Sequence, residues 1–321
     1  MGTFSSRLAA ALLLLLAPAT VSQLDYNLIE VNELGHPNDP GVDFTFQTTQ
    51  PGPEGVGGVA AADFNKDGYV DLYFPNSEGF ASHLYVNQQD GTFSEAAVLH
   101  GVDEPSKRRA TAVFFDYDND GDLDLLTIGY PGVEDDNSDM FTMFRNDGAP
   151  GYLFTDVTVS AGGFALAATI ESTLDTLPAG VSVADYDRDG HLDFIATWFR
   201  QFLGDSAADQ PRLFRNVPNP SPPANGQMDY SPRIFVDASI DAGLDVPSGG
   251  LYWMPTLFDV NRDGYPDLHF NIEFGEDVLR LNNGDGTFGP DIGTASRLIS
   301  NEPNSGYEMG IGLGEIDNDS D

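Results

Sequence analysis

Residues Asp116 to Asp124 read DYDNDGDLD, and three other segments repeat this pattern of acidic, amide and glycine residues. The three segments are DFNKDGYVD from Asp63 to Asp71, DYDRDGHLD from Asp185 to Asp193, and DVNRDGYPD from Asp259 to Asp267. All four follow Dx[DN]xDGxxD, and a chain of this composition would contain on the order of 0.01 such matches by chance. The pattern therefore marks an internal repeat.

The spacing within each loop suits a calcium ion. Oxygens at positions 1, 3 and 5 converge as the chain curls, position 7 offers its backbone carbonyl, and a later acid completes the shell. Glycine at position 6 permits the positive φ angle that the curl requires. The closing acid here is Asp at position 9, whereas helical EF-hand loops use Glu at position 12. The candidate metal ligands are Asp63, Asn65, Asp67, Tyr69 and Asp71; Asp116, Asp118, Asp120, Asp122 and Asp124; Asp185, Asp187, Asp189, His191 and Asp193; and Asp259, Asn261, Asp263, Tyr265 and Asp267.

Charge and ligand type favour calcium as the only cofactor. Carboxylates about 5 Å apart repel by roughly 3 kcal/mol per pair at an effective dielectric near 20, and a bound cation removes that cost. Oxygen ligands in a flexible loop suit calcium better than magnesium, and no histidine or cysteine side chain is placed to favour zinc. The alternative is that Asp and Gly simply form turns, which explains one loop but poorly explains four.

The segments around the loops predict an all-β fold. Short β-rich runs follow the loops, such as DLYF and DFIAT, and a second apolar strand in each unit ends in Asn87, Asn146, Asn216 or Asn282 before a turn and another strand. The loops begin at positions 63, 116, 185, 259 and 315, so the spacings are 53, 69, 74 and 56 residues. Repeats of this length with four strands each predict a β-propeller.

The calcium loop followed by NxxDGTF resembles the FG-GAP or VCBS repeats of integrin-α-type β-propellers. The segment YEMGIGLGEIDND, which ends at Asp319, is similar to repeats of the cartilage acidic protein family, whose bacterial relatives often carry an ASPIC/UnbV domain. The resemblance covers residues 56–321 and implies calcium at the four complete loops, with Asn65 and Asn261 replacing a charged ligand. A fifth loop begins at Glu315, and the sequence stops inside it at Asp321 without an ASPIC/UnbV region. The resemblance therefore implies a truncated propeller of about four and a half blades.

The N-terminus is typical of a secretory signal peptide. Arg7 precedes an apolar run from Leu8 to Ala17, which is far shorter than the ~20 residues that span a membrane. We expect a secreted protein, or a periplasmic one in a Gram-negative bacterium. The predicted organisation is a signal peptide (1–22), an N-terminal segment with a possible closing strand at Phe44–Thr49 (23–55), and propeller repeats (56–108, 109–178, 179–251, 252–307 and a truncated 308–321).

Composition limits the possible partners. The 321 residues include 51 acidic and 14 basic side chains, which give a formal net charge of −37 and argue against nucleic acids and anionic lipids. Hydrophobic residues make up 40% of the chain, so it can bury a core. Because the chain has no cysteine, disulfides cannot stabilise it, and bound metal is the expected substitute.

Other candidate sites are weaker. The basic cluster Lys107–Arg109 is expected to be a solvated loop, with a ligand contact as the alternative, and the acidic run 134–139 is also expected to be solvated. We expect the His191 side chain to face solvent. Recognition is expected on the long varied loops 75–83, 129–140, 160–178, 198–211 and 239–252, which hold or adjoin Trp198, Arg200, Tyr252 and Trp253. Burial of both tryptophans in the core is the alternative.

Two classes of function remain open. The first is a secreted calcium-binding propeller that acts in cell adhesion, or in recognition of extracellular protein or carbohydrate. The second is a secreted polysaccharide lyase or hydrolase on a propeller platform, and fold alone does not separate the two. The sequence contains no GxSxG, HExxH, P-loop or CxxC motif, so we predict that the protein is not an enzyme and has no catalytic residues.

Overall fold

The computed structural model describes residues 58–76, 80–129, 140–162, 164, 176–200, 211–221, 227–244, 251–273 and 277–293. Within them the chain forms sixteen strands in four antiparallel sheets, and one short helix. The all-β prediction is therefore confirmed. The predicted signal peptide (1–22), the N-terminal segment (23–55), the acidic run (134–139) and the fifth repeat (308–321) lie outside the described residues. None of the described helices is long and apolar enough to cross a membrane.

Each sheet is one blade of four consecutive strands, paired in chain order. Blade 1 consists of β1 (Ala60–Ala62), β2 (Asp71–Phe74), β3 (His83–Asn87) and β4 (Phe93–Glu95), followed by α1 (Ala97–His100). Blade 2 consists of β5 (Arg109–Phe115), β6 (Asp124–Gly129), β7 (Phe141–Asn146) and β8 (Phe154–Asp156). Blade 3 consists of β9 (Thr176–Ala184), β10 (Asp193–Arg200), β11 (Arg212–Pro218) and β12 (Arg233–Asp237). Blade 4 consists of β13 (Leu251–Phe258), β14 (Asp267–Glu273), β15 (Val278–Asn282) and β16 (Phe288–Asp291).

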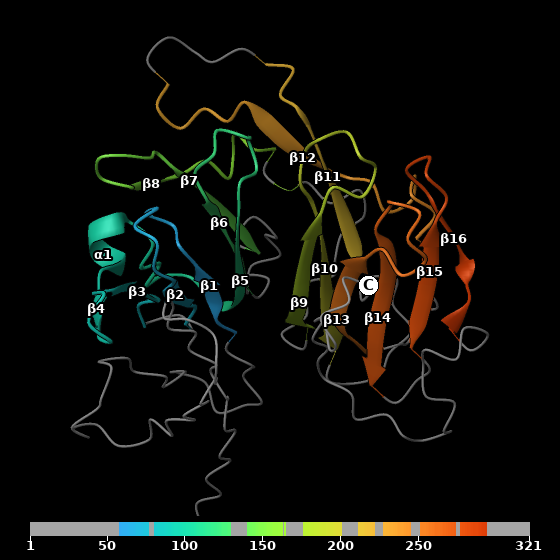
Figure 1. Ribbon diagram of the computed structural model, residues 1–321, viewed down its shortest axis with the longest axis horizontal. Coiled ribbons are helices and arrows are strands. Elements are labelled where there is room, and N and C mark those ends of the chain that lie inside the picture. Colours follow the sequence, from blue (N-terminus) through green and yellow to red (C-terminus); the bar gives the residue numbers. More distant parts are fainter. Residues whose placement is uncertain are drawn as a thin grey trace, which may run out of the picture.

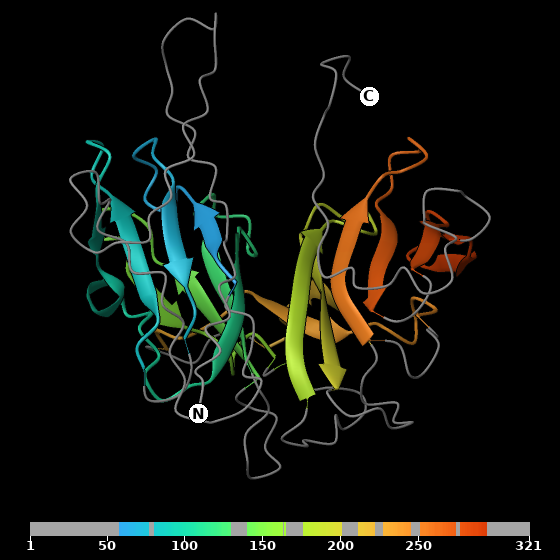
Figure 2. The same cartoon turned by 90° about the horizontal axis from the view of Figure 1, so that it is seen from below.

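The blades are arranged radially, as in a β-propeller. The first strand of each blade contacts the first strand of the next, so β1, β5, β9 and β13 form the inner side. Figure 1 shows the outermost strands β4 and β16 at opposite sides of the molecule, and Figure 2 shows the four sheets from a perpendicular direction. Each blade is a simple meander, in which every strand pairs with the next strand along the chain.

The core lies between consecutive blades, and strand alternation builds it. Leu125 on β6 belongs to a buried cluster that includes Tyr73 of blade 1, whereas the adjacent Leu126 belongs to a cluster that includes Phe194 of blade 3. Ile195, next to Phe194, belongs to a third cluster shared with blade 4. Neighbouring side chains on a strand point to opposite faces of the sheet. Two consecutive apolar residues therefore pack one blade against both of its neighbours. The apolar runs in the sequence reflect sheets that are covered on both faces.

Both tryptophans and the basic cluster belong to this packing. Trp198 is fully buried and contacts Phe141 edge to face, and Trp253 is buried as well, so the core alternative is correct for both. Tyr252 is also buried, and the Arg200 side chain lies outside the description. The expectation of a solvated cluster is wrong for Arg109, which is fully buried. Arg109 is the first residue of β5, and its guanidinium forms an ion pair with Glu104 at 2.8 Å. The same group donates a hydrogen bond to the Thr142 hydroxyl.

In blades 2, 3 and 4 an asparagine at or near the end of the third strand joins the blade to the one before it. Asn146 Nδ2 donates to the Leu123 carbonyl of its own blade at 3.1 Å and to the Phe64 carbonyl of blade 1 at 3.0 Å. Asn216 and Asn282 repeat both bonds in blades 3 and 4. For Asn87 in blade 1, the structure gives one such bond, to the Val70 carbonyl of its own blade.

We therefore expect Asn146→Ala to destabilise the protein by about 3 kcal/mol, because it leaves the buried Phe64 carbonyl without its donor and removes two further bonds. Asn87→Ala is the matched control, with an expected cost of about 1 kcal/mol, since it removes intra-blade bonds of the same kind. Urea unfolding of both variants under the same conditions measures the two losses. Equal losses would show that the inter-blade bond contributes nothing.

Candidate metal centres

The four acidic loops occupy the same place in each blade, between its first and second strands. The residue at position 9 pairs across the hairpin with the residue just before the loop, as Asp71 does with Ala62 and Asp124 with Phe115. The same register recurs in blades 3 and 4. Because the blades share one strand order, all four loops lie at the same end of the propeller.

Each loop has the same backbone. In the first, second and fourth loops the carboxylate at position 1 accepts hydrogen bonds from backbone N–H groups at positions 5 and 6, as Asp63 does from Asp67 at 3.0 Å and from Gly68 at 2.9 Å. In the third loop the position 6 bond is kept, and the position 5 N–H donates to Asp187. The glycines at position 6 have φ angles of 89° or 90°, and the residues at position 4 have φ angles of 58° to 62°. The sequence-based expectation of a curled loop with a left-handed glycine is therefore met in all four blades.

Carboxylates converge in the second and third loops. Asp116, Asp118 and Asp120 place one oxygen each within 4.8 Å of one another, and Asp185, Asp187 and Asp193 do the same. In the first and fourth loops position 3 is an asparagine, whose side-chain oxygen accepts the N–H of position 5. Among the described residues, those two loops do not form such a group of three acids.

Some oxygens in the loops are buried without a hydrogen-bond donor, and this observation tests whether a cation fits. Asp118 Oδ1, Asp185 Oδ1 and Asp71 Oδ2 are in this position. An unpaired buried carboxylate oxygen is costly, and a hard cation is a suitable partner for a site made only of oxygens. The residues therefore fit a divalent cation, which positions 1, 3, 5, 7 and 9 would hold.

The acid at position 9 also has a role that the sequence did not predict. Asp71, Asp124, Asp193 and Asp267 are fully buried, and Oδ1 of each accepts the backbone N–H of the third-strand asparagine at 2.8 Å. In the last three, Oδ2 accepts the N–H of position 2, for example Tyr117 at 3.0 Å. This contact could have been predicted from the asparagine that lies 15 to 23 residues after the last Asp of each Dx[DN]xDGxxD loop.

Burial makes these acids hard to ionise. It raises the pKa of Asp71 to about 7, of Asp193 to about 8 and of Asp124 to about 9. Repulsion from neighbouring loop carboxylates raises these pKa values further, whereas hydrogen bonds from backbone N–H groups lower them. Burial likewise raises the pKa of Asp118 to about 6. A carboxyl group with a raised pKa in the folded state costs stability as the pH rises above its ordinary value toward the raised one. A bound cation offsets this cost near neutral pH.

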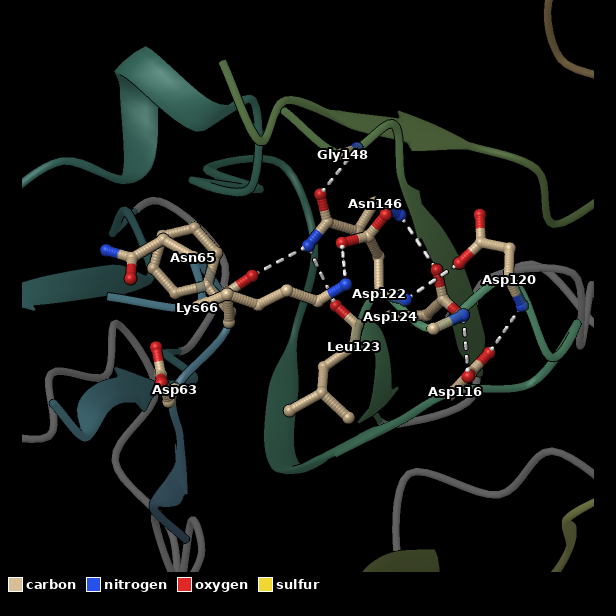
Figure 3. A network of polar contacts seen from close by, with 12 residues as sticks. Asp63, Asn65, Lys66, Asp116, Asp120, Asp122, Leu123, Asp124, Asn146 and Gly148 are labelled. Atoms are coloured by element: carbon tan, nitrogen blue, oxygen red, sulfur yellow. Dashed lines mark hydrogen bonds and ion pairs between the residues drawn. The ribbon is translucent and has the colours of Figure 1, made fainter. Parts of the chain in front are cut away.

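The side chains at position 7 do not simply face solvent. His191 was expected to do so, but it is half-buried, with Nδ1 3.0 Å from Asn119 Nδ2 of the preceding blade. Asp122, at the same position in blade 2, forms an ion pair with Lys66 of blade 1 at 2.8 Å. Figure 3 shows this junction, with Lys66 reaching from the first loop to Asp122 beside Asn146.

Comparison with known proteins supports the repeat assignment for one stretch. Residues 76–127 match the family model described as an FG-GAP-like repeat. This stretch runs from the end of β2 to β6, so it joins the outer half of blade 1 to the inner half of blade 2 and includes the loop that begins at Asp116. The resemblance to FG-GAP repeats is confirmed there, and no comparison supports a link to the ASPIC/UnbV family.

Other comparisons add less. No curated protein matches the chain. Among solved structures, the chain is similar to a lectin from Agrocybe aegerita, described for its specific recognition of non-reducing terminal N-acetylglucosamine. The identity is 20%, the TM-score is 0.39, and the match covers 75% of this chain and 55% of that chain. The chain thus spans about half the length of that structure.

Proposed function

We propose that this protein is a secreted, calcium-binding β-propeller that recognises extracellular carbohydrate or protein without catalysing a reaction. The single observation that carries the proposal is the set of four acidic loops with the same backbone angles, two of which bring three carboxylates together, and in which some buried oxygens have no donor. Calcium is the ion that best suits flexible all-oxygen loops, and its role would be to hold the hairpins rigid. The excess of acids and the signal-like N-terminus support an extracellular setting, where calcium is available.

A cavity beside the third loop offers a place for a ligand. Its volume is about 440 Å³, which is within the usual range of small-molecule sites, and Tyr186, Asp187, Arg215, Asp241 and Asp285 are among its lining residues. Carboxylates, a guanidinium and a tyrosine in one concave surface suit a hydroxyl-rich ligand such as a sugar, because each supplies directional hydrogen bonds. The cavity joins a metal loop of blade 3 to the β15–β16 turn of blade 4, so calcium would fix one of its walls.

The test combines metal analysis with a glycan array on the full chain. We expect about four bound calcium ions per chain, retention of one class of glycan in calcium, loss of that retention in chelator, and no release of unsaturated sugars. Asp241→Ala should weaken retention roughly tenfold, since it removes a polar contact from the cavity. Asp229→Ala, an exposed acid that is not among the residues lining the cavity, is the control. Absence of bound calcium would refute the proposal. Release of unsaturated sugars would show that the protein is an enzyme and not only a recognition module.

A further inference from the structure

Position 4 of each of the first three acidic loops contacts the following blade. In the first loop this residue is Lys66, whose Nζ lies 2.8 Å from Asp122 Oδ1 at position 7 of the second loop. In the second loop it is Asn119, whose Nδ2 donates to the Gly190 carbonyl at 2.8 Å and lies 3.0 Å from His191 Nδ1. Gly190 and His191 are positions 6 and 7 of the third loop.

The third junction repeats this placement with different chemistry. Arg188 at position 4 of the third loop stacks its guanidinium over the ring of Tyr265, 5.1 Å from the ring centre, and Tyr265 is position 7 of the fourth loop. The three junctions therefore pair a cation with an acid, an amide with an imidazole, and a cation with an aromatic ring. Each pair is chemically matched, although the residue types differ from blade to blade.

The loop backbone directs these side chains toward the next blade. Lys66, Asn119 and Arg188 have φ angles of 58°, 60° and 58°, a left-handed conformation that non-glycine residues seldom adopt. A hydrogen bond from the N–H of position 6 to the acid at position 1 holds this curl in all three loops. The N–H of position 5 donates to the same acid in the first two loops and to Asp187 in the third. At the third junction the glycine of the receiving loop also leaves space, because a Cβ atom at Gly264 would lie 2.8 Å from Arg188 Nη1.

We infer that position 4 of each loop is a positioning residue for calcium in the following loop. This inference rests on the proposed calcium function. Position 7 contributes a backbone carbonyl to the ion, and the direction of that carbonyl depends on how the residue is held. A contact that fixes the residue before the ion arrives reduces the ordering that binding must impose, which raises affinity. Each acidic loop would thus depend on the loop of the preceding blade as well as on its own ligands.

Asn119→Gly tests the inference without a change of charge. Glycine accepts the left-handed φ angle, so the second loop keeps its backbone while its contact with Gly190 and His191 is lost. Hydrogen exchange of peptides that contain each loop, followed across a calcium titration of the full chain, gives a separate midpoint for each loop. We expect the midpoint of the third loop to rise about fivefold, the value of one net hydrogen bond.

Arg262→Gly is the matched control. Arg262 is position 4 of the fourth loop, with a φ angle of 62°, and among the described residues no blade follows it. This variant measures what glycine at position 4, together with loss of the side chain there, does to its own loop, and the second loop in Asn119→Gly should change no more than that. The melting temperature without calcium reports any general structural effect. An unchanged midpoint for the third loop would overturn the inference. Absence of calcium-dependent protection in every loop of the unaltered protein would instead overturn the proposed calcium function.

Discussion

Removal of calcium is expected to lower the melting temperature of this protein by about 20 °C or more. At a free concentration one hundred times the dissociation constant, one bound ion stabilises the folded state by about 2.7 kcal/mol, and four independent ions contribute about four times as much. One kcal/mol shifts the melting temperature of a domain of 150 to 250 residues by roughly 2 to 4 °C. The repulsion among loop acids and their raised pKa values make the metal-free fold weaker still near neutral pH.

Calorimetry of the full chain in chelator and in millimolar calcium measures this shift. Magnesium at the same concentration is the control, and we expect it to restore only a small part of the loss, because its compact octahedral shell fits a wide, flexible oxygen loop poorly. All samples are compared at the same pH, because the raised pKa values of the buried acids make their protonation change near neutral pH. A metal-free sample that melts at the same temperature as the calcium-saturated one would refute a structural role for the ion.

The acidic loops and the four-stranded blades could be predicted from sequence because their determinants are local. Each loop needs acids at fixed spacing and a glycine at position 6, and all of these residues lie within nine positions of one another. The four-stranded unit follows from short apolar runs separated by turn residues, which also act over short distances. Such determinants can be recognised in a short segment of sequence without knowledge of the rest of the fold.

Contacts between blades could not be predicted, because they join residues far apart in sequence. Asn216 reaches the Tyr117 carbonyl across 99 positions, and Asn119 reaches His191 across 72. Trp198 is buried because an alternating strand turns it toward Phe141 of blade 2, which no local pattern indicates. The radial arrangement alone brings such residues together.

Asp124→Ala is expected to destabilise the protein by about 3 kcal/mol even when calcium is absent. Asp124 is fully buried, and its two oxygens accept the backbone N–H groups of Asn146 at 2.8 Å and of Tyr117 at 3.0 Å. Alanine would leave both N–H groups buried without an acceptor, at roughly 1 to 3 kcal/mol each, partly offset because the costly burial of an acid ends. Urea unfolding in chelator at low temperature, where the metal-free chain is most stable, measures the loss.

Asp120→Ala separates this role from metal binding. Asp120 lies in the same loop and belongs to its group of three converging acids, but it is exposed, and its side chain accepts one hydrogen bond from the Asp122 N–H. Without calcium its replacement should therefore cost less than about 1 kcal/mol, whereas in calcium both variants should lose the ion of the second loop. If the two variants lose equal stability in chelator, the acid at position 9 acts only as a metal ligand. A larger loss for Asp124→Ala would mean that one carboxylate contacts the third strand, the loop backbone and the ion. This triple role would explain why position 9 is an aspartate in all four of these loops.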